Sequence, residues 1–245
     1  MAGKSAAKWF AFGIALLLLA TVAATLFELA RKPKTSVPKV AIGTKDQVYF
    51  SHGATAADAL ALGQALQNTG FFSDRGASVL VSKGAGGAIV SFVLNDGAWN
   101  DPRAVASFEE IGRRIAASIG GFPIRIHLVD ASWTEHKSVV VGKAMIGPRD
   151  AIYYLGNATE DDAKALGEAL RKAGYLADLG VTVVLSKGDG TAIGFVVADG
   201  VWDRREAPAA FEQLARRVAA SVGGLPVQLR LLNAEMEVKQ EAMVR

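Results

Sequence analysis

The sequence predicts an α+β protein in which an N-terminal transmembrane helix precedes two tandem βαββαβ domains of the ferredoxin-like type. Three observations support this fold class: residues 150–233 repeat residues 46–130, an uncharged apolar run lies near the N-terminus, and each copy alternates strand and helix patterns in the order β, α, β, β, α, β. A repeat of about a hundred residues is too long for a solenoid unit, so it indicates a duplicated domain.

Two short segments align the copies. Residues 159–167 match residues 55–63 at an offset of 104, and the Asp-Gly-x-Trp segment at 199–202 matches residues 96–99 at an offset of 103. The lost residue falls in a glycine-rich turn between these segments. We therefore expect four parts, which are an anchor or signal peptide at 1–30, a linker at 31–38, and repeats at 39–138 and 139–245.

The apolar run at residues 9–27 is 19 residues without a charge, a length that just spans a bilayer as a helix. Basic residues flank it on both sides and leave its orientation open. A cleaved signal peptide with small residues at 22–24 is the alternative. We favour a single-pass, uncleaved anchor because the apolar run continues through Leu26 and Phe27. In either case we expect the globular part outside the cytoplasm, in the periplasm or the extracellular space.

The bulk composition restricts the function classes. The formal charge is +3 and the sequence pI is about 9.1, with Lys and Arg interspersed among Asp and Glu outside the N-terminal flanks. This pattern argues against nucleic acid as the main partner, which needs a concentrated basic stripe. The chain has no cysteine, so disulfides, thiol chemistry and cysteine-based metal sites are excluded.

The first copy starts with a short strand at 47–50, followed by a helix. Thr55 with Asp58, and Thr159 with Asp162, form a capping-box pattern at the start of that helix in each copy.

The helix of the first copy has an apolar face formed by Ala59, Leu62 and Leu66. Gly63 and its counterpart Gly167 lie in mid-helix, each at a cost of roughly 1 kcal/mol relative to Ala. We therefore expect another element to approach the helix closely at these glycines.

Two strand patterns follow at 77–82 and 88–94, joined by a glycine-rich segment that begins with Lys83. The equivalent joint of the second copy begins with Lys187 and contains an Asp-Gly pair, which is a strong hairpin signal. A phosphate-binding loop is the alternative for a lysine among glycines. We reject it because such a loop opens a helix, whereas here a strand follows.

A second helix is predicted at 102–119, with a core face formed by Phe108, Ile111, Ile115 and Ile119. The Arg-Arg pair at 113–114 follows the Glu-Glu pair at 109–110 at helical spacing, which favours a self-paired, solvated face over an anion site. A half-buried strand at 124–128 completes the copy.

Two split βαβ units that close one antiparallel sheet give the ferredoxin-like arrangement, with both helices on one face. The other face would carry Leu80, Ile89 and Val93, which is too apolar for water. We therefore expect the sheets of the two copies to pack face to face, or the same face to pair between chains. Residues 39–43 and 143–147 could each add an edge strand.

No catalytic, cofactor-binding or metal-ligating set stands out, and we expect no cofactor. The three histidines lack an obvious partner by sequence. Among the charged or aromatic residues that both copies retain are Asp46 and Asp150, Asp74 and Asp178, Lys83 and Lys187, Asp96 and Asp199, and Trp99 and Trp202. We predict structural roles for most of them. The Asp-Gly-x-Trp turn, with Asp96, Trp99, Asp199 and Trp202, is the candidate for contact with a ligand or partner.

These features predict a membrane-anchored envelope protein without enzymatic activity, whose duplicated domain binds another envelope protein or its own kind. The alternative is a membrane-tethered sensor that holds a small ligand between the two repeats. An enzyme that uses carboxylates from both copies is the third hypothesis, and no pair of carboxylates supports it.

Overall fold

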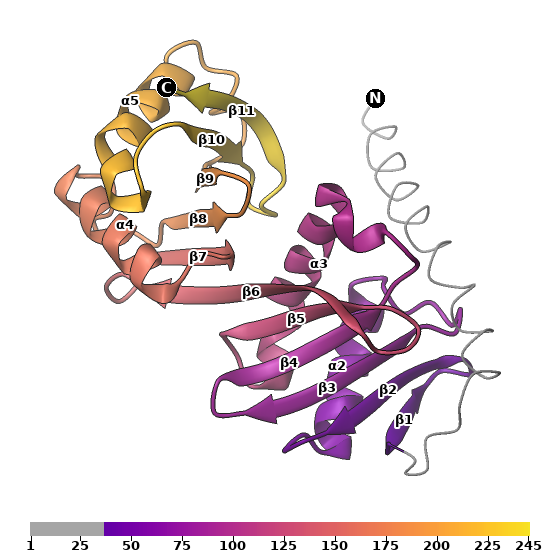
Figure 1. Cartoon of the computed structure of the whole chain (residues 1–245). Coiled ribbons are helices and arrows are strands. Elements are labelled where there is room, and N and C mark those ends of the chain that lie inside the picture. Colours follow the sequence, from indigo (N-terminus) through magenta and orange to yellow (C-terminus); the bar gives the residue numbers. More distant parts are fainter. Residues whose placement is uncertain (1–36) are drawn as a thin grey trace. The chain divides into compact units, whose positions relative to one another are not determined.

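The computed structural model describes residues 37–245 of the chain (Figure 1). In this part of the chain the α-helices are α2 (Ala56–Asn68), α3 (Pro102–Ile115), α4 (Glu160–Lys172) and α5 (Ala207–Val218). The strands are β1 (Lys39–Ile42), β2 (Asp46–Ser51), β3 (Ser78–Gly84), β4 (Gly87–Val93), β5 (Ile124–Val129), β6 (Glu135–Met145), β7 (Ala151–Gly156), β8 (Thr182–Lys187), β9 (Thr191–Val196), β10 (Val227–Leu232) and β11 (Val238–Val244). The chain divides into two compact units after Val139, within β6. We call them unit 1 and unit 2.

The ferredoxin-like prediction is wrong. All eleven strands are hydrogen-bonded in sequence order, as one mixed sheet, so two separate sheets packed face to face do not form. In a split βαβ unit another strand lies between the two that the helix connects. Here β2 and β3, which α2 connects, are direct parallel neighbours, and β7 and β8 are paired in the same way.

The reason for this error lies in the edge strands. Alternation of strands and helices predicts the order of elements, but adjacent and split crossovers share that order and the same handedness. The structure has the adjacent crossover. In it β1 pairs antiparallel with β2, and the second half of β6 pairs antiparallel with β7. Sequence reasoning had treated these two segments as optional additions.

The single-pass transmembrane helix is not among the helices just described. Across residues 37–245 no helix is long and apolar enough to cross a bilayer. The predicted anchor at 9–27 lies outside the described residues.

The local predictions within each copy are confirmed. Thr55 and Thr159 cap α2 and α4, each with the predicted capping box. The glycine-rich joint after Lys83 is a hairpin turn, in which Gly84 pairs with Gly87. The helix at 102–119 forms as α3 and a following 3₁₀ turn.

Close packing explains the mid-helix glycines. A Cβ on Gly63 would lie 2.2 Å from Cδ1 of Ile42 on β1, and a Cβ on Gly167 would lie 2.5 Å from Cδ1 of Ile146, directly after β6. Such distances are impossible without displacement of the isoleucine. The absence of a side chain at Gly63 and Gly167 therefore lets α2 pack closely against Ile42 of β1 and α4 against Ile146 after β6.

In each unit the helices lie against one face of the strands. In unit 1, alternate residues of the strands are fully buried against α2 and α3, including Val48, Val79, Val90 and Ile126. Phe71, Phe92 and Phe108 form an aromatic group in this core, with ring centroids 4.9 to 6.0 Å apart. Unit 2 repeats it with Tyr175, Phe195 and Phe211. We call the other side of the unit 1 strands the opposite face.

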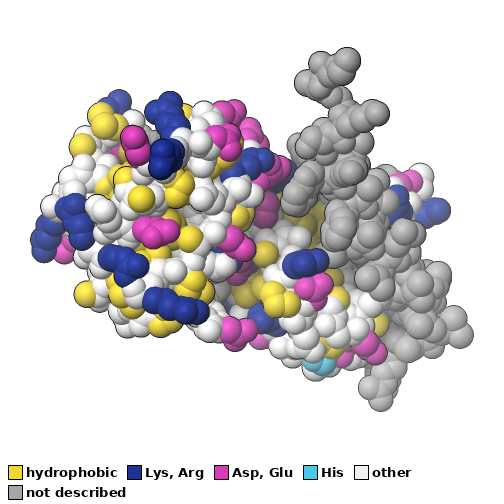
Figure 2. All heavy atoms as spheres, turned by 90° about the horizontal axis from the view of Figure 1, so that it is seen from above, with side chains coloured by type: hydrophobic (Ala, Val, Ile, Leu, Met, Phe, Trp, Pro, Cys, Tyr) yellow, Lys and Arg dark blue, Asp and Glu magenta, His cyan; other side chains and the backbone are white. Residues whose placement is uncertain are grey.

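Charged side chains of both signs are interspersed on the side of the molecule shown in Figure 2. The Arg-Arg pair of α3 follows the same pattern. Arg113 and Arg114 both pair with Glu110, which agrees with a solvated, self-paired helix surface.

Candidate functional site

A buried aspartate organises the crossover between the parallel strands in both units. Asp46, at the start of β2, accepts hydrogen bonds from the backbone N–H groups of Asp74, Gly76 and Ala77 at 2.7 to 2.8 Å. The Asp74 carboxylate in turn accepts bonds from Thr44 and Lys45 in the β1–β2 turn. These two carboxylates therefore tie the turn before β2 to the loop before β3.

Asp150 does the same in unit 2, where it accepts bonds from the N–H groups of Asp178, Gly180 and Val181. Burial by itself would raise the pKa of the Asp150 carboxyl, but these backbone donors outweigh it and hold the pKa below its ordinary value. The first two aspartate pairs that the copies retain are thus structural.

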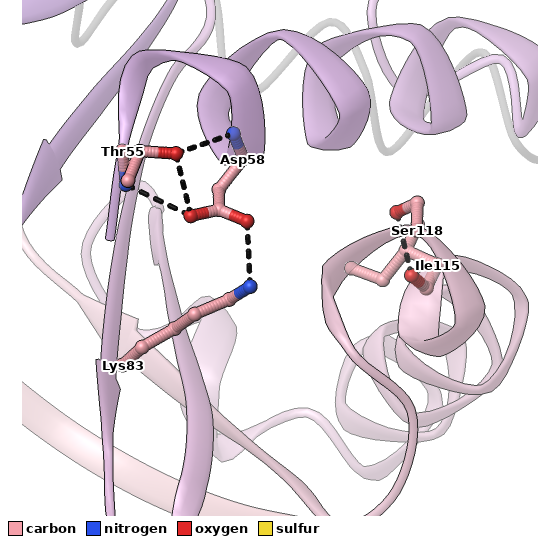
Figure 3. A network of polar contacts seen from close by, with 5 residues as sticks. All are labelled: Thr55, Asp58, Lys83, Ile115 and Ser118. Carbon is pink, nitrogen blue, oxygen red and sulfur yellow. Dashed lines mark hydrogen bonds and ion pairs between the residues drawn. The ribbon is translucent and has the colours of Figure 1, made fainter. Parts of the chain in front are cut away.

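The retained lysines have a structural partner as well. Lys83 reaches from β3 to the first turn of α2, where its Nζ lies 2.6 Å from Oδ1 of Asp58 (Figure 3). The other carboxylate oxygen of Asp58 accepts bonds from the N–H and hydroxyl of Thr55. The hydrogen bond from Lys83, together with those from Thr55, lowers the pKa of Asp58 to about 2. Lys187 and Asp162 repeat the pair at 2.7 Å.

The predicted Asp-Gly-x-Trp turn lies at the surface of each unit. Asp96 and Asp199 are exposed, and Trp99 and Trp202 are half-buried. Gly97 and Gly200 have φ values of 84° and 79°, a left-handed conformation that glycine adopts without strain. The glycine conformation is therefore the same in both copies. The residues that follow it differ, because Ala98–Asn100 form a 3₁₀ turn and residues 201–203 do not.

In unit 1 the Trp99 ring stacks in parallel on His136 of β6, with centroids 3.8 Å apart and an angle of 6° between the rings. Nε2 of His136 lies 2.9 Å from Oδ2 of Asp130. Asp130 opens the turn between β5 and β6, and its other oxygen accepts bonds from the N–H groups of Ser132 and Thr134. Trp99 thus rests on a histidine whose orientation the hairpin turn fixes.

Burial alone would raise the pKa of Asp130, but the hydrogen bonds from His136, Ser132 and Thr134 hold it well below its usual range. Asp130 is therefore ionised at neutral pH and acts as an acceptor only.

Unit 2 replaces this assembly with a different set of side chains. Trp202 packs against the buried cluster of the unit, and Lys239 stands where unit 1 has His136. The Lys239 ammonium pairs with Glu237, which raises the pKa of Lys239. Asn233 takes the place of Asp130 and bonds to Glu237 through both its amide atoms.

A second histidine of unit 1 lies on the opposite face. Nδ1 of His127 on β5 is 2.9 Å from Oε2 of Glu135 on β6. The turn between these strands carries Trp133, which has a φ of 65° and meets Tyr49 of β2 edge to face, with centroids 5.7 Å apart. The β5–β6 hairpin therefore brings a second aromatic contact to the same unit.

Sequence reasoning missed both histidine–carboxylate pairs. His136 follows Asp130 by six residues, and Glu135 follows His127 by eight. Residues at such separations come close together near the turn of a hairpin, so a predicted hairpin at 124–141 would have suggested both pairs. In the predicted fold each copy ended at the strand equivalent to 124–128, and that strand was not paired with the segment that follows it.

Among residues 37–245, no group of three or more His, Asp or Glu side chains could hold a metal ion. The side chains that the structure brings together on unit 1 are suited to contact by stacking, hydrogen bonding and charge.

Comparisons with known proteins give no family. No protein-family model matches the chain, and no curated protein matches it. Among solved structures, a putative phenazine biosynthesis PhzC/PhzF protein from Clostridium difficile (strain 630) is 12% identical, over 81% of this chain and 82% of that chain, at a TM-score of 0.16. A likeness at that level carries no argument about fold or function.

Proposed function

We propose that the protein is a non-enzymatic binding module that engages another protein, or a second copy of itself, through the surface of unit 1. This surface, called the Trp99 surface below, consists of Asp96, Trp99, Asp130 and His136. The observation that carries the proposal is the parallel Trp99–His136 stack, which is half exposed and fixed by Asp130.

Preorganised aromatic side chains are suited to protein recognition. Tryptophan is enriched among residues that dominate binding energy, because it offers a large contact area with few rotatable bonds. Trp99 lies in a short 3₁₀ turn and His136 lies on a strand, so both side chains come from ordered backbone. Little conformational entropy remains to be lost when a partner binds.

The edge strands support a surface contact over strand addition. At one end of the strand order, β1 has four residues and begins with Lys39 directly after Pro38. At the other end, β11 carries Lys239 and Glu241 and has a register shift against β10. Short length, charge, proline and irregular register are devices that discourage pairing with another chain.

The retained polar residues other than the Asp-Gly-x-Trp turn belong to the fold. Asp46, Asp74, Asp58 and Lys83 are engaged in backbone or ion-pair contacts that unit 2 repeats, which assigns them to the fold. Attachment to a membrane through residues 9–27, a location outside the cytoplasm and the small-ligand alternative stay predictions from the sequence.

Site-specific crosslinking tests the proposal. A photo-reactive amino acid replaces Asp96 in the full-length protein expressed in its native membrane, and a matched variant carries it at Asp199. Both positions are exposed, so neither substitution disturbs a core. We expect a protein adduct of defined mass, identified by mass spectrometry, from position 96 and none from position 199.

Two tryptophan variants give the control. Trp99→Ala should weaken the adduct at position 96 roughly thirtyfold in affinity, the effect of losing about 2 kcal/mol at a hot spot. Trp202→Ala should leave that adduct unchanged. Equal adducts from both positions, or an adduct that is insensitive to Trp99→Ala, would rule out the Trp99 surface.

A further inference from the structure

We infer that the partner of the Trp99 surface is a second copy of this chain, which contributes the cations at residues 31–34, called the basic segment below. This contact rests on the proposed function, in which the partner is either another protein or a second copy. In it, the cations of the basic segment meet hydrogen-bond acceptors and negative charge on unit 1.

Two acceptors of the Trp99 surface have no donor within the described part of the chain. The exposed Asp96 carboxylate makes no hydrogen bond or ion pair with another residue of 37–245. Asp130 accepts from Nε2 of His136, so in the neutral imidazole Nδ1 is an acceptor, and no donor among residues 37–245 reaches it. Lys137, next on β6, points to the other face of the strand. A partner that supplies donors would satisfy both acceptors.

The charge next to Trp99 is negative. Asp96 precedes Trp99 by three residues and Asp101 follows it by two, and both carboxylates are exposed. Asp130 adds a third carboxylate through the histidine that stacks on Trp99. Arg103, on the first turn of α3, supplies one cation. Three carboxylates and one guanidinium sum to a charge of −2, which is complementary to a cationic segment.

The basic segment consists of cations without counter-charges. Arg31, Lys32 and Lys34 are three cations in four residues, and no Asp or Glu occurs from residue 29 to residue 45. The Arg-Arg pair of α3, in contrast, is matched by Glu110 one turn earlier. Unmatched cations are attracted to a surface of opposite charge.

The Trp99 surface lies too far away for the basic segment of the same chain. The Pro38 carbonyl accepts from the N–H of Phe50, so the chain enters unit 1 at the C-terminal end of β2. Trp99 follows β4, whose C-terminal end lies beside the N-terminal ends of β3 and β2, at the other end of the strands. His136 is on β6, five strands from β1, which is about 24 Å across the sheet (Figure 1). Lys34 precedes Pro38 by four residues, a span of at most about 14 Å. A second copy must therefore supply the cations.

The contact is heterologous, because the basic segment and the Trp99 surface are different parts of the chain. Each copy offers its surface to one neighbour and its basic segment to another. Repetition of such a contact gives a closed ring or an open array.

Unit 2 is not suited to the same contact. In the turn and hairpin that correspond to the Trp99 surface, three cations occur where unit 1 has none; these are Arg204, Arg205 and Lys239. Their unit 1 equivalents are Asp101, Pro102 and His136. The Glu237 carboxylate of unit 2 already pairs with Lys239. The basic segment would meet like charge there, so it is directed to unit 1.

Photo-crosslinking of the full-length protein in its native membrane tests the partner. A photo-reactive amino acid at Asn100, which is exposed and next to Trp99, leaves the carboxylates of the surface in place. We expect an adduct of two copies of the chain, at twice its mass of 25.7 kDa. After digestion with chymotrypsin, the adduct should map to residues 28–49, the peptide between Phe27 and Tyr49. The same amino acid at Asp203 of unit 2 should give no such adduct.

An adduct with a different protein, or with another part of a second copy, overturns the basic segment as the partner and leaves the proposed function in place. Absence of any adduct from both Asn100 and Asp96 overturns the proposed function, and the basic segment with it.

Titration of the purified full-length protein with a synthetic peptide of residues 29–40 isolates the role of charge. The protein is labelled with 5-fluorotryptophan, and Trp99→Phe assigns the Trp99 resonance. We expect this resonance to shift saturably with the peptide. A control peptide with Arg31→Gln, Lys32→Gln and Lys34→Gln should bind at least about tenfold more weakly, because three exposed ion pairs each contribute a few-fold.

Variants of the protein define the surface that the peptide contacts. Asp101→Asn keeps the N-cap oxygen of α3 and removes one charge, so it should weaken binding about threefold. His136→Lys introduces the unit 2 residue and should weaken binding at least about tenfold. Asp199→Asn, in unit 2, should change nothing. Equal binding of the two peptides, or undiminished binding to His136→Lys, overturns the inferred contact.

Discussion

Unit 1 and unit 2 stabilise their backbones with equivalent side chains, but the side chains at their surfaces differ. Asp46 and Asp150 each bind three backbone N–H groups, and Lys83 and Lys187 each pair with the capping aspartate of a helix. After β5 and β10 the copies diverge, with His136 and Trp133 in one and Lys239 and Met236 in the other. The two copies therefore share the contacts that stabilise the fold and differ in the side chains of one hairpin.

The largest expected effect concerns the shared aspartates. Asp46→Ala and Asp150→Ala each leave three backbone donors without their carboxylate acceptor, most of them part-buried, which should cost about 3 kcal/mol of unfolding free energy in either unit. Urea denaturation of the full-length protein measures it. Asp→Asn variants, which keep one acceptor oxygen, should cost less. A loss in one unit alone would break the equivalence of the two copies at this position.

An intermediate effect is expected at the mid-helix glycines. Gly63→Ala and Gly167→Ala gain roughly 1 kcal/mol in helix propensity, but the new methyl group displaces Ile42 or Ile146, at a cost of about 1–3 kcal/mol. We expect net destabilisation by about 1 kcal/mol in both units, seen as a lower urea midpoint.

The double variant Gly63→Ala with Ile42→Ala provides the control for overpacking. It should show a favourable coupling between the two substitutions in a double-mutant cycle, because the smaller side chain at 42 makes room for the methyl group. Additive losses would mean that the glycine serves another purpose than packing against β1.

Local chemistry was predictable from the sequence, and strand pairing was not. Thr55 with Asp58 signals a helix start because the pattern depends only on residues three apart. The mid-helix Gly63 indicated a close neighbour, but nothing local says that this neighbour is Ile42, twenty-one residues earlier. The adjacent pairing of β2 with β3 depends on β1 in the same way.

The candidate site shows the same limit. The repeated Asp-Gly-x-Trp turn marked Trp99 and Trp202 as equivalent, and the glycines before them do share a left-handed conformation. Trp99 stacks on His136, which lies more than thirty residues further along the chain and reaches the tryptophan only through the fold, and Lys239 stands at the equivalent position of unit 2. A stack between distant residues has no periodic pattern that a single sequence could show.

The smallest expected effect concerns the retained lysines, and it ties stability to pH. The Asp58 carboxyl, with its pKa lowered from 3.8 to about 2, contributes stability that is present above pH 3.8 and lost as the pH falls through about 2. Lys83→Met removes the largest cause of that shift, so the pKa of Asp58 should move back toward 3.8. Carboxyl NMR titration measures this change directly.

At neutral pH, Lys83→Met and Lys187→Met should each cost up to about 1 kcal/mol, the range for partly exposed ion pairs. Because Asp58 and Asp162 both become protonated in strong acid, the difference from the wild type should shrink as the pH falls through the lowered pKa of each carboxyl and vanish well below it. If the wild type and the Lys→Met variant still differ in unfolding free energy in strong acid, the aliphatic part of the lysine stabilises the fold by packing in a way that methionine does not reproduce. A pKa of Asp58 that stays near 2 in Lys83→Met would assign the shift to the Thr55 donors instead.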